Sequence, residues 1–133
     1  MKIKIVSIMF CMFMFTIGFG QQIFTADNYQ PEEEFEKTWS KDIYSDSLVT
    51  STLLWIKGTI NSHKHELHTE HIYILEGSGD MSVGGETMSV IKGDIVIIPM
   101  NTAHSLKVTS MDPLKVISIK SPQYFGKDRV FVE

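Results

Sequence analysis

The chain has five histidines, and four of them fall within nine residues: His63, His65, His68 and His71, with His104 standing alone farther on. Side chains two residues apart in a β-strand point to the same face, so His63 and His65 can bind one metal ion together. A third and a fourth ligand must come from elsewhere, and Glu70 and His104 are the natural candidates. This cluster is the strongest chemical signal in the sequence.

Two other interpretations of the cluster stay open at this point. A His-x-His pair is a short pattern, and it also occurs as ordinary exposed or hydrogen-bonded side chains. In a helix, His65, His68 and His71 would line one face. Gly58 and Asn61 before the segment, and the β-rich run after it, argue against that helix. The zinc-peptidase pattern His-Glu-x-x-His is absent from the sequence.

The elements that must position these residues have the pattern of short β-strands. Seven apolar or alternating runs, bounded by Gly, Pro, Asn and Asp turns, fall at residues 52–56, 71–75, 80–83, 86–90, 95–98, 105–108 and 114–120. No segment of this region has ten residues of helical periodicity. The sequence therefore predicts an all-β fold, either a sandwich or a small barrel.

One turn also predicts a register. Gly84-Gly85 separates two of the runs, and two residues that tolerate positive φ suit a tight hairpin. That hairpin pairs Val83 with Glu86 and Met81 with Met88.

The spacing of these residues resembles the two motifs of the cupin family. The first motif is Gly58-TINS-His63-Lys64-His65-ELHT-Glu70-HIYILE-Gly77. The second is Gly93-DIVII-Pro99-Met100-Asn101-TA-His104-SLK-Val108. The lead from Gly58 is one residue shorter than usual, and Asn101 and Val108 stand where the family has Gly and Asn. Asn is a mild replacement because it also tolerates the left-handed conformation.

The resemblance implies a double-stranded β-helix, the cupin or jelly-roll barrel, over residues 51–133. It also implies that His63, His65, Glu70 and His104 bind one divalent transition metal inside the barrel. Three neutral imidazoles and a carboxylate suit Fe, Mn, Zn, Ni or Cu ions and do not select among them.

Strand alternation makes the expected site more specific. If Glu70 faces the interior, Ile72 and Ile74 share its face and His71 points outward. His68 falls in the turn between ligand strands, where we expect a surface histidine. A hydrogen-bond partner of a ligand, or a proton carrier at the pocket mouth, is the alternative for His68.

The resemblance further implies a metal-dependent enzyme that acts on a small polar metabolite, of the oxygenase or sugar-acid isomerase type. The alternative is a non-enzymatic cupin module that binds a ligand or a metal. No residue is assigned a catalytic role. A net charge of -4 leaves no basic surplus for phosphates, so nucleic-acid binding is not expected.

The beginning of the chain is typical of a secretory signal peptide. Lys2 and Lys4 precede an uncharged apolar run over residues 5–19, and Gly20 follows. The run is shorter than the roughly 18–20 residues of a spanning helix, although a retained anchor or a buried helix is an open alternative. We expect residues 1–20 to be cleaved near Gly20, with export to the periplasm or the medium and no membrane attachment afterwards. Cleavage would also remove Cys11, the only cysteine.

Residues 21–50 are polar and include a small acidic run at residues 31–36, so we expect an irregular N-terminal arm. Phe35, Trp39 and Tyr44 would pin this arm to the barrel. Its aromatic residues and the outward Tyr73 supply a surface for a homodimer.

Overall fold

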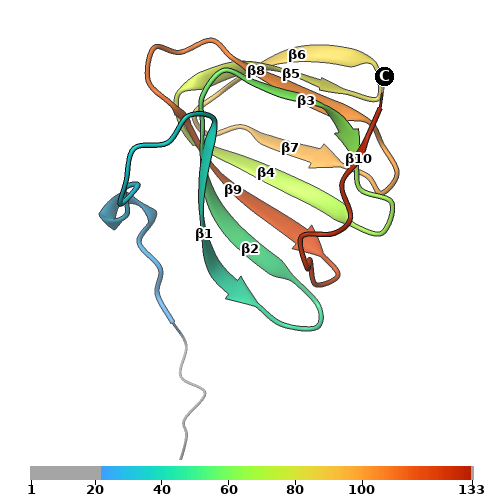
Figure 1. The fold of residues 1–133 in the computed structure, drawn as a ribbon, viewed down its shortest axis with the longest axis horizontal. Coiled ribbons are helices and arrows are strands. Elements are labelled where there is room, and N and C mark those ends of the chain that lie inside the picture. Colours follow the sequence, from blue (N-terminus) through green and yellow to red (C-terminus); the bar gives the residue numbers. More distant parts are fainter. Residues whose placement is uncertain (1–21, 133) are drawn as a thin grey trace, which may run out of the picture.

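The computed structural model describes residues 22–132, which form ten β-strands and one short 3-10 helix (Figure 1). In chain order these elements are η1 Ala26–Asn28, β1 Thr38–Ser45, β2 Thr50–Ile56, β3 Thr59–Lys64, β4 Thr69–Glu76, β5 Ser78–Val83, β6 Glu86–Ile91, β7 Ile95–Ile98, β8 His104–Val108, β9 Leu114–Ser121 and β10 Val130–Phe131.

The strands form two antiparallel sheets that face each other (Figure 1). The first sheet has the order β1-β2-β9-β4-β7, and the second has the order β10-β3-β8-β5-β6. Several neighbours in the sheets, such as β2 with β9 and β3 with β8, are far apart in the chain. The all-β prediction is confirmed, and all seven predicted strands are present.

The predicted hairpin is confirmed in its register. Val83 pairs with Glu86 and Met81 pairs with Met88 across β5 and β6. Gly84 and Gly85 have φ values of 60° and 93°, which side chains with a Cβ rarely adopt.

The expectation of an irregular segment up to residue 50 is wrong for residues 38–45. These residues form β1, the outermost strand of the first sheet, in which Trp39 pairs with Trp55 of β2. No side chain of β1 is buried, and most of them are polar, so the apolar signal of a strand is weak here. The strands β3 and β10 were also not among the seven runs.

The core lies between the two sheets. Its buried apolar side chains come from both of them: Ile56, Ile74, Met81, Val90, Val96, Ile98, Leu106, Leu114 and Val116. Removing this surface from water supplies the main driving force for the fold.

The outer face of the first sheet carries a fully buried lysine. The Nζ atom of Lys115 lies 3.0 Å from Oε1 of Glu76, 3.4 Å from the carbonyl oxygen of Tyr29, and 5.1 Å from the centre of the Trp55 ring. The segment before β1 therefore covers this face and supplies a partner for the buried charge.

The signal peptide predicted at residues 1–20 lies outside the described residues. Between residues 22 and 132, no helix has the length and apolar character needed to span a bilayer.

Candidate metal centre

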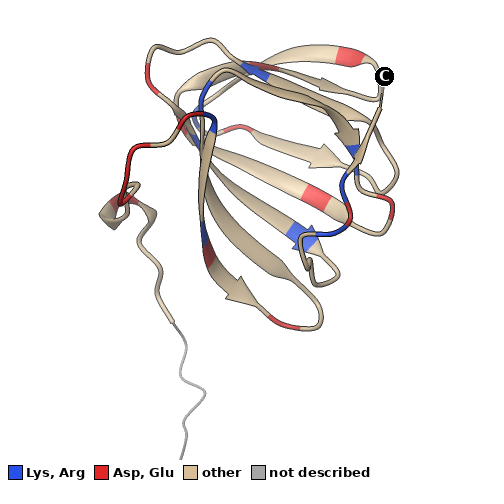
Figure 2. Ribbon diagram, viewed as in Figure 1, with Lys and Arg blue, Asp and Glu red and all other residues tan. Residues whose placement is uncertain are grey.

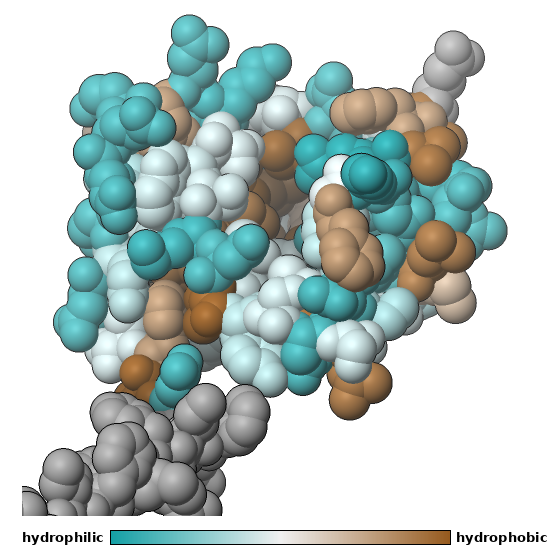
Figure 3. All heavy atoms as spheres, turned by 60° about the horizontal axis from the view of Figure 1, so that its bottom comes forward, coloured by the Kyte–Doolittle hydropathy of each residue, from teal (hydrophilic) through white to brown (hydrophobic). Residues whose placement is uncertain are grey.

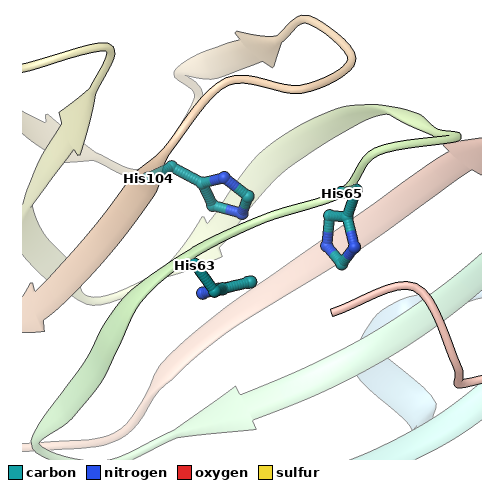
Figure 4. A group of neighbouring side chains, drawn as sticks. All are labelled: His63, His65 and His104. Atoms are coloured by element: carbon teal, nitrogen blue, oxygen red, sulfur yellow. The ribbon is translucent and has the colours of Figure 1, made fainter. Parts of the chain in front are cut away.

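Three histidines meet inside the barrel, as the sequence predicted (Figure 4). His63 in β3 and His104 in β8 are direct cross-strand partners, and His65 follows one residue after the end of β3. One ring nitrogen from each lies within 4.8 Å of the other two. All three side chains are buried, with 2–4% of their surface exposed.

Backbone carbonyls fix the orientation of each ring. The Nδ1 atom of His63 lies 2.9 Å from the oxygen of Asn61, and Nδ1 of His104 lies 3.0 Å from the oxygen of Thr102. The Nδ1 atom of His65 bonds to the carbonyl oxygen of Asp128. A carbonyl only accepts, so each Nδ1 is the donor and each neutral ring keeps a lone pair on Nε2.

Two of these lone pairs have no hydrogen-bond partner. The Nε2 atoms of His65 and His104 are buried without one, and each lies 3.4 Å from Oε2 of Glu70. A bare imidazole nitrogen and a carboxylate oxygen repel at that distance unless a proton or a cation lies between them. The donor set therefore fits a divalent metal ion, for which neutral imidazole and carboxylate are ordinary ligands.

Glu70 reaches the histidines from the opposite sheet. Its cross-strand partner is Lys120 of β9, whose Nζ lies 2.5 Å from Oε1 of Glu70 and 2.7 Å from Oγ of Ser118. Ser118 donates a hydrogen bond to the same Oε1 atom. Figure 2 shows an acidic position on β4 and a basic position on the neighbouring strand β9.

The carboxylate of Glu70 is held in its ionised form. Burial alone would raise its pKa, but the donors and positive charge around it, the ammonium group of Lys120 among them, lower the pKa well below its ordinary value. One oxygen is thus occupied by Lys120 and Ser118, and the other is directed at the imidazoles.

Lys120 is the main residue of the site that the sequence interpretation missed. Val116 is a core residue, and alternation from it places Ser118 and Lys120 on the same inner face of β9. This alternation can be predicted from the sequence. The pairing of Lys120 with Glu70 cannot, because no local pattern indicates that β9 lies beside β4.

Burial also controls the protonation of His63. Burial lowers its pKa to about 4, although the hydrogen bond to the carbonyl of Asn61 opposes this, and the positive charge of Arg129 adds to the lowering. The ring is therefore neutral over the physiological range, which is the form that binds a metal.

His63, His104 and Glu70 border an internal cavity of about 130 Å³. Most of its remaining wall is apolar, formed by Leu54, Ile56, Ile60, Ile72, Met81 and Leu106, and Lys120 and Arg129 also line it. Figure 3 shows the molecule hollowed between polar rims, with apolar side chains at depth.

Ile72 and Ile74 share the face of Glu70 and His71 is exposed, so the predicted alternation of side chains along β4 is confirmed.

His68 is not the surface histidine that its turn position suggested. It is buried, and its Nδ1 lies 2.5 Å from Oδ2 of Asp128, while its Nε2 lies 2.9 Å from the carbonyl oxygen of Gln123. The Asp128 carboxylate also accepts from the backbone N–H groups of Glu66 and Leu67. Burial opposes ionisation of Asp128, but these donors lower its pKa overall.

Comparison with known proteins agrees with this geometry. The family model described as a cupin domain matches residues 53–120. A solved structure from Klebsiella pneumoniae, described as an uncharacterized conserved protein with a double-stranded β-helix domain, superposes with a TM-score of 0.71 at 19% identity. The match covers 86% of this chain and 99% of the Klebsiella pneumoniae chain. The predicted double-stranded β-helix is therefore confirmed.

Two relatives show the range of proteins that carry this sequence pattern. An uncharacterized protein of Methanocaldococcus jannaschii is 38% identical over 71 residues, which are 53% of this chain and 57% of that protein. A mannose-1-phosphate guanylyltransferase of Salmonella typhimurium is 30% identical over 108 residues, which are 78% of this chain and 22% of the enzyme. The matched stretch is thus only part of each relative.

The lowered pKa of His63 makes the stability of the metal-free protein depend on pH. Below about pH 6.5 the unfolded chain protonates this residue, whereas the folded chain does not until about pH 4. We expect the free energy of unfolding to fall between these values by on the order of 2 kcal/mol, and this contribution to be constant above pH 6.5. Urea denaturation of chelator-treated protein between pH 7 and pH 4.5 measures the fall.

His63→Gln should flatten this pH dependence, and the exposed His71→Gln should leave it as in the wild type. Equal slopes for wild type and His63→Gln would show that burial of His63 is not the cause.

Proposed function

Because the chain belongs to the cupin family, we propose that it binds one divalent transition metal through His63, His65, His104 and Glu70, and that it acts on a small polar metabolite. The observation that carries the proposal is the pair of buried Nε2 atoms, on His65 and His104, that face Oε2 of Glu70 at 3.4 Å with no hydrogen bond. A cation in this position would relieve the repulsion and would give the lone pairs on both Nε2 atoms a partner.

A metal ion held there would supply a Lewis acid with room for a ligand, since four protein groups leave positions free on a six-coordinate ion. Fe, Mn, Zn, Ni and Cu all accept this donor set. The protein contributes orientation. The carbonyl oxygens of Asn61, Thr102 and Asp128 hold the rings, and Lys120 holds the carboxylate of Glu70.

A metal-dependent enzyme of the oxygenase or sugar-acid isomerase type is the function that this cavity supports best. A module that only binds a ligand could do without the full set of metal ligands, whereas here His63, His65, His104 and Glu70 are all brought together. One of the relatives is named as an enzyme of a sugar phosphate, which is consistent with a small carbohydrate-like ligand. Metal analysis of the purified protein, followed by screens for oxygen uptake and for turnover of sugar acids, tests the enzyme against the binding module.

Removing a ligand should remove the metal. We expect wild type to hold one divalent ion per chain, and His65→Ala or His104→Ala to reduce occupancy to near zero, because three remaining donors hold an ion far less tightly. Elemental analysis after dialysis measures occupancy, and circular dichroism on the same samples reports the fold. The fold should persist, because the apolar core between the sheets does not depend on the ion.

His71→Ala is the matched control, since His71 lies in the same histidine-rich segment but is exposed on the outer face. It should keep the ion. Loss of the ion from His71→Ala, with retention in His65→Ala, would refute the assignment of the ligands.

We also propose that the protein is exported and that residues 1–20 are removed. The charged start and the short apolar run support this. Intact-mass analysis of the protein from the periplasm or the medium should give a chain that begins near residue 21. A membrane-embedded product that retains Met1 would contradict the proposal.

We propose finally that the chain forms a homodimer. Exposed apolar side chains gather on the outer face near the edge strand β7, where Tyr73 pairs with Ile95 and His71 pairs with Ile97. Light scattering at micromolar concentration should give twice the chain mass, and Ile97→Lys should give a monomer because it places a charge in this patch. Met88→Lys, on β6 of the other sheet, should leave the dimer intact, and a monomeric wild type would disprove it.

A further inference from the structure

A second, outer groove adjoins the cavity of the metal centre. It measures about 490 Å³ and shares three lining residues with the cavity: Leu54, Lys120 and Arg129. A ligand that reaches the imidazoles through this groove passes the side chains of Lys120 and Arg129.

The rest of the outer groove is rich in hydroxyl groups. Ser40 of β1 and Thr50 and Thr52 of β2 line it together with the carboxylate of Asp42. Thr52 donates a hydrogen bond of 2.8 Å from Oγ1 to Oδ1 of Asp42. Such a row of short donors and acceptors suits a ligand with several hydroxyl groups.

The two cationic side chains where the groove meets the cavity, Lys120 and Arg129, differ in whether they already have an anionic partner. The ammonium group of Lys120 is committed to Glu70 and Ser118. Arg129 is exposed, and no acidic side chain within residues 22–132 forms an ion pair with it.

The backbone holds Arg129 in place from both sides. On one side, Asp128 is tied to His65, His68 and the loop between them. On the other, Val130 pairs with Lys64 as β10 joins β3. The guanidinium group thus extends from a fixed point, which reduces the entropy lost when it binds an anion.

We propose that Arg129 binds the carboxylate of a small polyhydroxylated acid, whose hydroxyl groups lie along Ser40, Asp42 and Thr52. The proposal rests on the proposed function, because it takes the metal centre as the reacting end of the same ligand. A carboxylate fits better than a phosphate, since a dianion needs more than one unpaired cation and the Asp42 carboxylate lines the same groove.

Paired sugars test the inference directly. The protein is incubated with a divalent transition metal, dialysed, and titrated calorimetrically with D-glucuronate, D-galacturonate and D-mannuronate. These titrations are compared with those of the neutral parents D-glucose, D-galactose and D-mannose. At least one uronate should bind about tenfold or more tightly than its parent, because a charge-assisted, bidentate contact is added. D-glucose 6-phosphate should bind no better than the best uronate.

Arg129→Gln should abolish the preference and leave binding of the neutral sugar unchanged, and Arg129→Lys should restore part of it. Lys127→Gln removes the same charge from the same segment but outside both cavities, and it should have no effect. The inference is wrong if no uronate is preferred, if the phosphate binds best, or if Arg129→Gln keeps the preference.

The same samples separate this inference from the proposed function. Wild-type protein that holds metal but shows no uronate preference overturns the role of Arg129 alone. Wild-type protein that holds no metal, yet prefers uronates through Arg129, overturns the metal centre alone.

Discussion

The buried carboxylate of Glu70 is the constraint on which the rest of the site depends. A charge so deep in an apolar barrel is costly unless both of its oxygens have partners. Lys120 and Ser118 serve one oxygen from the neighbouring strand, and the imidazoles of the opposite sheet face the other. The electrostatic balance of the site therefore spans both sheets.

Two cross-strand pairs set this balance. His63 is paired with His104 in one sheet, and Glu70 is paired with Lys120 in the other. Because side chains alternate along a strand, a slip of one residue in either pairing would turn the polar group of the slipped strand outward and bring its neighbour in. The register of the strands and the chemistry of the site are thus fixed together.

Much of the fold could be predicted because its signals are local. Alternation and turn residues predicted seven of the ten described strands and the Gly84-Gly85 register, and the motif spacing brought His63, His65 and His104 together. The strand β1 was not predicted, because most of its side chains are polar and none is buried. The roles of Lys120, Asp128 and Arg129 were not predicted for another reason. Their roles depend on which distant segments become neighbours, and no local pattern contains that information.

The three histidines near Asp128 lie in three different environments. His65 is held for the interior by the Asp128 carbonyl, His68 is bound to its carboxylate, and His71 remains in solvent. In an unfolded chain these residues are equivalent neighbours, and a dissolved metal ion can bind any pair of them. For the proposed metal, binding to the unfolded chain would offset part of the stability that the same ion would give to the folded state. A chain that met the metal only after the barrel had closed would avoid this competition, so the order of folding and metal addition would affect the yield of correctly loaded protein.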